Sequence, residues 1–226
     1  MNNRFEFFEK LNLPQQISEK QLFFVGGATR EIICHNKLPR DIDICGDICA
    51  EELSTLDLQN KQYIKKLHSL RFVCGNHDID LTAFRKEEYK KGYFPSKVER
   101  VSTAKADSER RDFTINAIYI NKAGEILDFH DGEKHLFEKR IVQISPKTLE
   151  VDGMRILRMI RFSLTLGYQI DKDTLECAFE NKENILQIKK ERCLSEFKKF
   201  QPHITSENEK LIKELGIFSH LGINHQ

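Results

Sequence analysis

The sequence contains no long apolar segment, and no run of side chains approaches the ~20 apolar residues that a membrane-spanning helix needs. Residues 1–10 mix charged and polar side chains, unlike the apolar centre of a signal peptide. An excess of one charge is also missing, because Lys and Arg number 36 and Asp and Glu number 35. This balance excludes a uniformly basic nucleic-acid coat. We expect a cytoplasmic protein with no membrane partner.

Paired cysteines are missing as well. The six cysteines are scattered, and the one close pair, Cys45 and Cys49, lacks the second pair that completes a zinc site. A chain of 226 residues buries enough apolar surface to fold without disulfides. The sequence also has no internal repeat and no Gly/Ser linker, so we expect one large domain or one domain with a smaller companion.

A glycine turn near the N-terminus is the first signal of a binding site. Residues 22–25 form a short apolar run typical of a buried strand, and residues 28–34 have the pattern of a helix. Gly26 and Gly27 therefore lie at a strand-to-helix turn, where unpaired backbone N–H groups point outward. A triphosphate can approach such a turn closely.

Two carboxylates follow this turn. Asp41 and Asp43 are spaced two apart in a second apolar run, so on a strand they leave the same face. That geometry suits Mg²⁺, and two such ions would clamp the attacking and leaving oxygens of a phosphoryl displacement. Each motif alone is weak evidence for a binding site, because Gly-Gly is usually a plain turn and Asp-x-Asp is usually solvated. Their order and spacing favour a nucleotide site.

Asp80 is a candidate third carboxylate. It lies near the start of another alternating apolar run, residues 79–84. It joins the metal site if its strand lies beside that of Asp41 and Asp43. Otherwise it is an ordinary aspartate near the end of a strand.

Arg110, Arg111 and Asp112 precede an apolar run, residues 113–120, which we predict to be a strand that carries Asn116. Two adjacent arginines can hold phosphate or ribose, and Asp112 can orient one of them through a bidentate pair. A buried Asn116 needs partners such as a ribose hydroxyl or a loop backbone. The alternative is a surface ion pair at the entrance to a strand.

Residues 149–166 are predicted to form a helix in which Asp152, Arg155 and Arg158 follow one stripe. A carboxylate beside a guanidinium can read a base edge, because the acid accepts from an exocyclic amine and the arginine donates to the adjacent ring nitrogen. Cytosine and adenine present that edge, whereas uracil and guanine present a carbonyl and a ring N–H. The pair would therefore choose C and A, although an intrahelical salt bridge has the same spacing.

The pattern along the chain predicts an α+β fold in two parts. A part with a mixed sheet and short helices covers residues 1–145, and a helical part covers residues 146–226. Residues 85–109 are predicted to form a long loop. The strand candidates are residues 22–25, 42–45, 79–84, 113–120 and 125–129, and the helix candidates after residue 146 are 149–166, 173–180, 191–200 and 206–215.

Together these motifs resemble the class II tRNA nucleotidyltransferase and bacterial poly(A) polymerase family, within the polymerase-β-like nucleotidyltransferase superfamily. The resemblance implies a catalytic head domain at residues 1–145 and a nucleotide-selecting, RNA-binding neck domain at 146–226. Body and tail domains, which usually follow in the family, are expected to be missing. The matching segments are residues 24–31, 40–44, 110–117 and 152–158 with Asp80, and more loosely 128–136 and 191–192.

The resemblance also implies an activity, namely template-independent addition of CMP and AMP from CTP and ATP to the 3′ end of tRNA, with release of pyrophosphate. Two Mg²⁺ ions would be held by Asp41 and Asp43, which with Asp80 form the catalytic set. The loop at residues 85–109 is long enough for the flexible element that the family uses to switch from C to A. The implied nucleotide-binding residues are Gly26, Gly27, Arg30, Arg110, Arg111, Asp112, Asn116, Asp152, Arg155 and Arg158. Separately, the basic residues of the C-terminal third can contact phosphates, so Lys189, Lys190, Lys198 and Lys199 are the candidate RNA-binding residues.

Other activities are compatible with the same residues. Within the family, the alternatives are a poly(A) polymerase and an enzyme that adds only CC or only A. A non-catalytic RNA- or nucleotide-binding module needs no paired carboxylates, and a small-molecule nucleotidyltransferase, such as an antibiotic-modifying enzyme, needs no base reader. A homodimer or a helper subunit is the expected substitute for the missing domains in gripping RNA.

Overall fold

The computed structural model describes residues 6–90 and 94–223. The chain forms two compact units, of which unit 1 holds the described residues of Met1–Glu87 and Val98–Glu133. Unit 2 holds those of Glu88–Lys97 and Lys134–Gln226, so a segment from the middle of the chain belongs with the C-terminal helices. The division of roles between residues 1–145 and 146–226 stays a prediction.

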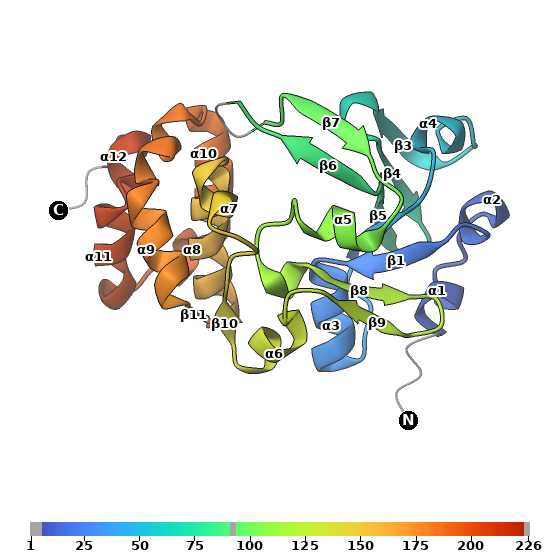
Figure 1. Ribbon diagram of the computed structural model, residues 1–226, viewed down its shortest axis with the longest axis horizontal. Helices are drawn as coiled ribbons and strands as arrows, with labels where there is room; N and C mark the ends of the chain where they lie inside the picture. The colour runs from blue at the N-terminus through green and yellow to red at the C-terminus, as the bar shows by residue number, and fades with distance from the viewer. Residues whose placement is uncertain (1–5, 91–93, 224–226) are drawn as a thin grey trace. The chain divides into compact units, whose positions relative to one another are not determined.

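Unit 1 is built on a seven-stranded sheet with the order β3-β4-β5-β2-β1-β8-β9 (Figure 1). β2 and β5 are parallel, whereas the other neighbouring strands of this sheet are antiparallel. The predicted α+β class with a mixed sheet is confirmed. The strands are β1 (Leu22–Val25), β2 (Asp41–Gly46), β3 (Gln59–Ile64), β4 (Ser69–Cys74), β5 (His77–Ala83), β8 (Ile118–Asn121) and β9 (Ile126–Asp128).

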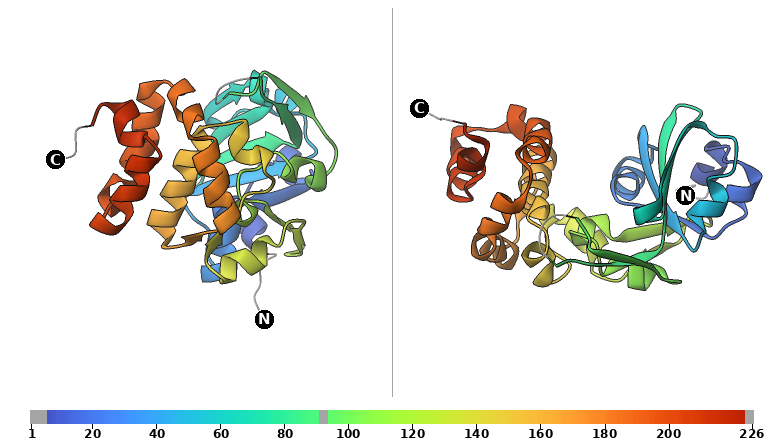
Figure 2. Two further views of the ribbon diagram at one scale, coloured as in Figure 1. Left: turned by 60° about the vertical axis from the view of Figure 1, so that its left-hand side comes forward. Right: turned by 90° about the horizontal axis from the view of Figure 1, so that it is seen from above.

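Alternation along β2 separates two faces of the sheet. Ile42 and Ile44 are buried on one face, whereas Asp41 and Asp43 are exposed on the other. Helix α3 (Gly27–His35) connects β1 to β2 and packs against both strands (Figure 2). The face of Asp43 continues into a buried cluster formed by Phe23, Val25, Cys45, Phe84, Ala104 and Tyr119. The carboxylates therefore lie where an apolar face ends.

Residues 85–109 were predicted to form a loop, and this prediction is wrong because the segment contains two strands and a helix. β6 (Arg85–Glu88) pairs with β7 (Lys97–Arg100) in a separate two-stranded sheet, and α5 (Ala104–Ser108) follows. Opposite charges face each other across the two strands, with Lys86 Nζ 2.6 Å from Glu99 Oε2. Residues 91–93 lie outside the described residues. The remaining short helices of unit 1 are α1 (Glu6–Lys10), α2 (Gln15–Ser18), α4 (Ala50–Leu53), and the 3₁₀-helices η1 (Lys65–Leu67) and η2 (Thr114–Asn116).

Unit 2 is mainly helical, and α8 packs along α10 in it. The predicted helices at residues 173–180, 191–200 and 206–215 are confirmed, whereas the part predicted as all-helical also contains β11. In the described part of the chain, no helix is long and apolar enough to cross a membrane. The elements are β10 (Arg140–Ile141), α7 (Lys147–Glu150), α8 (Met154–Leu166), β11 (Gln169–Ile170), α9 (Lys172–Glu180), η3 (Lys182–Gln187), α10 (Lys190–Phe200), η4 (Gln201–His203), α11 (Ser206–Glu214) and α12 (Ile217–Leu221), after α6 (Gly132–Phe137), which begins in unit 1.

Local hydrogen bonds to aspartates shorten two predicted elements. The strand predicted at residues 113–120 begins only at Ile118, because Asp112 accepts from the Phe113 N–H and residues 114–116 form a 3₁₀ turn. The helix predicted at residues 149–166 is two helices, α7 and α8. Asp152 lies between them and accepts from the Met154 N–H at 2.9 Å, at the start of α8.

Candidate active site

The turn between β1 and α3 depends on an unusual backbone conformation. Gly26 has φ 68° and ψ −128° and directly precedes α3. Residues with a side chain rarely adopt such angles. Thr29 Oγ1 donates to the Gly26 carbonyl at 2.9 Å and fixes the turn. The first N–H groups of α3 have no carbonyl partner within the helix, so this end of α3 can bind an anion.

Gly26 lies against a carboxylate of the neighbouring strand. β1 and β2 are antiparallel, and Val25 lies opposite Asp43. A Cβ atom on Gly26 would be 2.8 Å from Oδ2 of Asp43, too close for any ordinary contact. Glycine is therefore required both for its backbone angles and for the space that the carboxylate fills. The glycine turn and the acidic strand, which the sequence predicted to be close, lie side by side.

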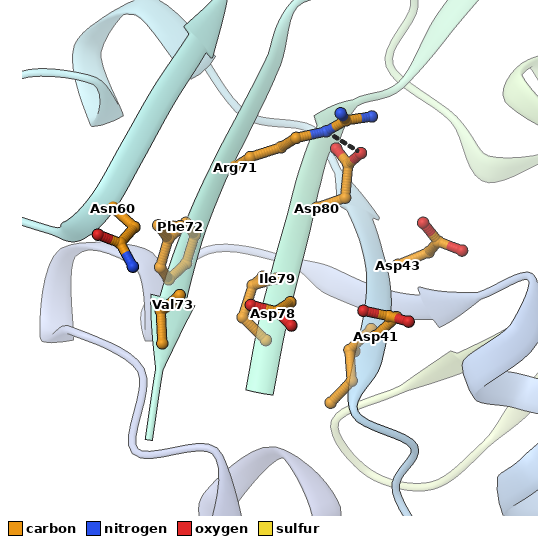
Figure 3. A pocket seen from close by; sticks show the side chains of 10 residues that line it. Asp41, Asp43, Asn60, Arg71, Phe72, Val73, Asp78, Ile79 and Asp80 are labelled. Atoms are coloured by element: carbon orange, nitrogen blue, oxygen red, sulfur yellow. Dashed lines mark hydrogen bonds and ion pairs between the residues drawn. The ribbon is translucent and has the colours of Figure 1, made fainter. Parts of the chain in front are cut away.

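Four aspartates share one face of the sheet. The parallel pairing of β2 with β5 places Asp41 beside Asp78 and Asp43 beside Asp80. Figure 3 shows these side chains on neighbouring strands along one side of a pocket. The pocket has a volume of about 400 Å³, and Arg71 of β4 is among its lining residues. The strand of Asp80 thus lies beside that of Asp41 and Asp43, which is the condition for its predicted role.

Asp80 has hydrogen-bond donors of its own. Arg71 Nε donates to Asp80 Oδ2 at 2.8 Å, and Ser69 Oγ donates to Oδ1 at 2.5 Å (Figure 3 marks the Arg71 contact). Thr82 Oγ1 also donates to Oδ1, at 3.3 Å. These donors compete with a metal ion for the carboxylate oxygens. The catalytic role of Asp80 stays a prediction.

Asp41 and Asp43 fit a magnesium site by their chemistry. Both are exposed carboxylates two residues apart on one strand. Within residues 6–90 and 94–223, no group of three or more His, Cys, Asp or Glu side chains is arranged to hold a metal ion. Mg²⁺ characteristically takes one or two carboxylates and completes its shell with substrate phosphates and water. The pair therefore fits ions that arrive with a nucleotide.

Arg30, in the first turns of α3, belongs to a chain of side chains. One of its Nη groups donates to Asn116 Oδ1, and Asn116 Nδ2 donates to Asp112 Oδ1 at 2.8 Å. Asn116 and Asp112 are buried. The partners of Asn116 are thus Arg30 and Asp112, where the sequence suggested a ribose hydroxyl or a loop backbone. The chain holds the Arg30 guanidinium beside the glycine turn.

Arg110 and Arg111 pair with Asp107 of α5. Arg110 Nε lies 2.8 Å from Asp107 Oδ1, and Arg111 Nη2 lies 2.8 Å from Oδ2. We predicted this orienting role for Asp112; Asp107 fills it for both arginines, and the role of Asp112 stays a prediction. Asp107 precedes the arginines by three and four residues, the spacing at which side chains on one helical turn meet. This spacing was the signal that could have identified Asp107.

The Asp107 cluster is buried and ionised. Burial raises the pKa of Asp107, but the guanidiniums of Arg110 and Arg111 outweigh burial and hold that pKa well below 3.8. The Tyr119 hydroxyl donates to Asp107 Oδ2 at 2.8 Å, and the Arg110 and Arg111 side chains are each only 13% exposed. The cluster therefore fixes both arginines in place, and their nucleotide-binding role stays a prediction.

Asp152 and Arg155 of unit 2 are neighbours, as their spacing predicted. Arg155 Nε lies 3.7 Å from Asp152 Oδ2, and both residues are 7% exposed. Arg155 Nη1 also donates to the Thr148 carbonyl at 3.2 Å. One turn further along α8, the Arg158 guanidinium lies 5.1 Å from the ring centroid of Phe162. The carboxylate and guanidinium of the predicted base reader therefore form one buried pair.

The environment of Asp152 shifts its titration. Burial raises the pKa of Asp152 from 3.8 to about 6, although Arg155, the Met154 N–H, Arg158 and Arg192 act in the opposite direction. Asp152 is therefore ionised at neutral pH and takes up a proton under mildly acidic conditions. An ionised carboxylate only accepts hydrogen bonds, which is what recognition of an exocyclic amine requires.

The four lysines predicted to bind RNA are exposed and lie at the two ends of α10. Lys189 and Lys190 are at its N-terminus, and Lys198 and Lys199 are in its last turn. A helix of 11 residues is roughly 16 Å long, so the lysines form two separate pairs. Lys199 Nζ lies 2.8 Å from Glu196 Oε2. The RNA-binding role of these lysines stays a prediction.

A mixed sheet that carries paired carboxylates beside a glycine turn defines a head domain of the nucleotidyltransferase class. Residues 22–142 match the Poly A polymerase head domain, and the chain belongs to this family. The match covers the glycine turn, the strand of Asp41 and Asp43, and the segment from Arg110 to Asn116. It confirms the resemblance that these motifs suggested.

The curated relatives of the chain include several CCA-adding enzymes. That of Bacillus cytotoxicus is 32% identical over 207 residues, which are 89% of this chain and 51% of the relative. That of Leuconostoc citreum is 33% identical over 182 residues, which are 79% of this chain and 45% of the relative. The chain spans about half the length of the curated relatives it matches.

Solved structures with the same fold include CCA-adding enzymes. The CCA-adding enzyme of Bacillus stearothermophilus in complex with CTP matches with a TM-score of 0.76 at 24% identity, over 99% of this chain and 54% of that one. The Thermotoga maritima CCA-adding enzyme complexed with tRNA matches with a TM-score of 0.73 at 23% identity, over 96% and 51%. These similarities establish the fold of the chain.

Proposed function

We propose that the protein adds CMP and AMP from CTP and ATP to the 3′ end of tRNA, without a template and with release of pyrophosphate. The observation that carries this proposal is the position of Asp43 against Gly26, because a candidate phosphate-binding turn and a candidate metal-binding carboxylate then lie side by side on neighbouring strands. The names of the curated relatives support CCA as the added sequence, and the Thermotoga maritima CCA-adding enzyme complexed with tRNA supports tRNA as the RNA.

The triphosphate is assigned to the start of α3. The N–H groups that follow Gly26 and Gly27 can donate to the phosphates. Arg30 adds a guanidinium, which is oriented by its hydrogen bond to Asn116. Asp112 keeps Asn116 in place through the hydrogen bond at 2.8 Å. Arg110 and Arg111, together with Asp112 and Asn116, are proposed to act on the ribose and phosphates.

Asp41 and Asp43 are proposed to hold two Mg²⁺ ions, which when bound activate the RNA 3′-hydroxyl and neutralise charge on the triphosphate. The chain contributes position and charge. The register of β1, β2 and β5 fixes the carboxylates relative to the glycine turn. Asp80, oriented by Arg71 and Ser69, is proposed as a third carboxylate of this set. Catalysis by such a site is mainly alignment and electrostatic stabilisation.

The incoming base is assigned to Asp152 and Arg155, with Arg158 nearby on the same helix. Asp152 accepts from the exocyclic amine of C or A, and Arg155 donates to the adjacent ring nitrogen. Uracil and guanine present a carbonyl to Asp152 and a ring N–H to Arg155, so both contacts become unfavourable. Buried groups left without partners discriminate strongly.

The RNA itself is assigned in part to the exposed lysines of α10. Lys189 and Lys190 at one end, and Lys198 and Lys199 at the other, can contact phosphates on a backbone that follows the helix. Participation of a second copy of the chain or of a helper subunit stays a prediction, which the mass of the protein–RNA complex tests.

Incubation of the protein with Mg²⁺, labelled CTP or ATP, and tRNA that lacks its 3′ end tests the proposal. We expect incorporation by the wild-type protein and none by the Asp41→Asn, Asp43→Asn double variant. Asp47→Asn, an exposed aspartate just after β2, is the matched control. Wild-type protein without incorporation, or a double variant that works equally well, would overturn the proposal. Tight RNA binding without turnover would instead favour a binding module.

Poly(A) addition is the second candidate function, because the family that matches the chain is named for poly A polymerase. A site that reads the amine edge accepts A as readily as C, so the geometry alone is compatible with both products. Sequencing the products formed with CTP alone, ATP alone and both nucleotides separates the outcomes. CCA addition predicts that growth stops after a short defined extension, whereas poly(A) addition predicts continued growth with ATP alone.

A further inference from the structure

Tyr89 contacts the base-reading Arg155 from a part of the chain that lies far away in the sequence. Cζ of Arg155 lies 5.4 Å from the centroid of the Tyr89 ring, and Arg155 Nη2 lies 3.5 Å from the Tyr89 hydroxyl oxygen. Tyr89 belongs to the segment Glu88–Lys97, which is part of unit 2 together with α8. The segment that we predicted to be a loop thus supplies a ring to the neighbourhood of Arg155.

This contact differs from the other arginine–aromatic contacts of α8. Arg158 and Arg161 both lie over Phe162, a residue of their own helix, so those contacts form whenever the helix forms. Arg155 instead meets a ring from outside α8. Its guanidinium is also next to Asp152 and donates to the Thr148 carbonyl, so it has partners in α7, in the link between α7 and α8, and in the residues after β6.

The plane of the guanidinium decides what Arg155 can recognise. Arginine is a donor only, with five N–H groups in one rigid plane. A freely rotating guanidinium could donate to the carbonyl of uracil or guanine as well as to the ring nitrogen of cytosine or adenine. Discrimination therefore requires that the guanidinium be held in one orientation, and an aromatic ring under the cation restricts its movement in addition to the contacts of its N–H groups.

We propose that Tyr89 is a positioning residue for Arg155, and that through Arg155 it contributes to the preference for C and A. The proposal rests on the base-reading role of Asp152 and Arg155 in the proposed function. Tyr89 itself does not read the base. It holds the guanidinium of Arg155, which does.

Three variants separate the ring from other contributions. Tyr89→Leu removes the aromatic face and keeps apolar bulk, whereas Tyr89→Phe keeps the face and removes the hydroxyl. Tyr63→Leu, at another half-buried tyrosine on β3 of unit 1, is the matched control. The readout is the ratio of kcat/KM for CTP to that for UTP, with KM and kcat determined separately. We expect Tyr89→Leu to lower this ratio by about tenfold or more, and Tyr89→Phe and Tyr63→Leu to keep it within about threefold, because the face of the ring acts on the cation.

A second readout does not depend on activity. The proton–nitrogen correlation spectrum of arginine side chains contains a signal from Arg155 Nε, which the Arg155→Lys variant identifies. We expect Tyr89→Leu to shift or broaden this signal and Tyr89→Phe to keep it sharp. Unchanged selectivity in Tyr89→Leu, when the wild-type protein discriminates, would overturn the proposal. A wild-type protein that does not discriminate would contradict the proposed function instead, whereas the spectrum would still report whether Tyr89 holds Arg155.

Discussion

Asp43 fills the space that a side chain on Gly26 would need, with its Oδ2 atom 2.8 Å from where a Cβ would lie. The relationship follows from the pairing of Val25 with Asp43 across β1 and β2. It places the carboxylate of Asp43 directly against the glycine turn, so the two parts of the candidate site are adjacent.

Gly26→Ala is expected to abolish most nucleotide incorporation, because the new methyl group displaces the Asp43 carboxylate and the backbone angles of Gly26 disfavour any side chain. Gly75→Ala is the matched control, since Gly75 also has a positive φ but nothing lies within 4 Å of a Cβ there. We expect a loss of activity of roughly a hundredfold or more in Gly26→Ala alone, as for other misplaced catalytic groups. Equal activities of the two variants would contradict the assigned contact.

Asn116→Ala is expected to raise KM for the nucleotide, because Arg30 loses the acceptor that orients it. A hydrogen bond to a charged group contributes about 1.5–3 kcal/mol, so a rise in KM of roughly tenfold to a hundredfold is expected. Asn121→Ala, at an exposed pair with Glu125 in the hairpin after β8, serves as the control. Steady-state kinetics with CTP measures both. An unchanged KM in Asn116→Ala would contradict the assignment of Arg30 to the phosphate site.

Asp107→Asn is expected to destabilise unit 1 by about 3–5 kcal/mol, because it removes the carboxylate that the buried guanidiniums of Arg110 and Arg111 share, although Arg110 keeps its contact with Glu87. Asp57→Asn, at an exposed position, should leave the free energy of unfolding nearly unchanged. The pKa of Asp107 is held below 3.8, so its contribution to stability is fully present above that pH and is lost only in stronger acid. Urea unfolding of the three proteins from pH 3 to pH 7 checks the size and the pH range.

Asp152→Asn is expected to abolish base selection and to remove a pH-dependent loss of stability that Asp152 causes in the wild-type protein. The pKa of Asp152 is raised by burial to about 6, so the ionised form is disfavoured in the folded state. The resulting loss of stability is absent near pH 4, grows as the pH rises towards 6 and is complete above 6. One pKa unit corresponds to ~1.4 kcal/mol, so the variant should gain up to about 3 kcal/mol over wild type between pH 4 and pH 7.5. Unfolding curves at these two pH values measure the gain, and a constant difference between the proteins would contradict the raised pKa.

The sequence predicted those parts of the site whose pattern reflects strand alternation or a glycine turn. Apolar residues that alternate with Asp41 and Asp43 specify both the strand and the face of the carboxylates, because side chains on a strand point to opposite faces. The edge strand β3 was missed because its side chains are mostly exposed and polar. Its position depends on pairing with β4, which no local pattern in β3 reports.

The errors at polar residues share another cause. Asp107 has the sequence context of a surface helix, and it is buried by partners that include Tyr119, the Arg85 N–H and two arginine side chains. The strand predicted at residues 113–120 failed because Asp112 competes for backbone N–H groups at its start. Tertiary contacts decided the environment of Asp107, and a side-chain hydrogen bond delayed the start of the strand at Ile118. Neither kind of contact is visible in the local pattern of apolar residues.

The most direct test of the account is a competition among CTP, ATP, UTP and GTP at equal concentrations, with Mg²⁺ and tRNA that lacks its 3′ end, followed by sequencing of the products. The account predicts that the wild-type protein incorporates C and A almost exclusively and that Asp152→Ala incorporates all four nucleotides. Incorporation of U and G by the wild-type protein as readily as C and A, or unchanged selectivity in Asp152→Ala, would contradict it.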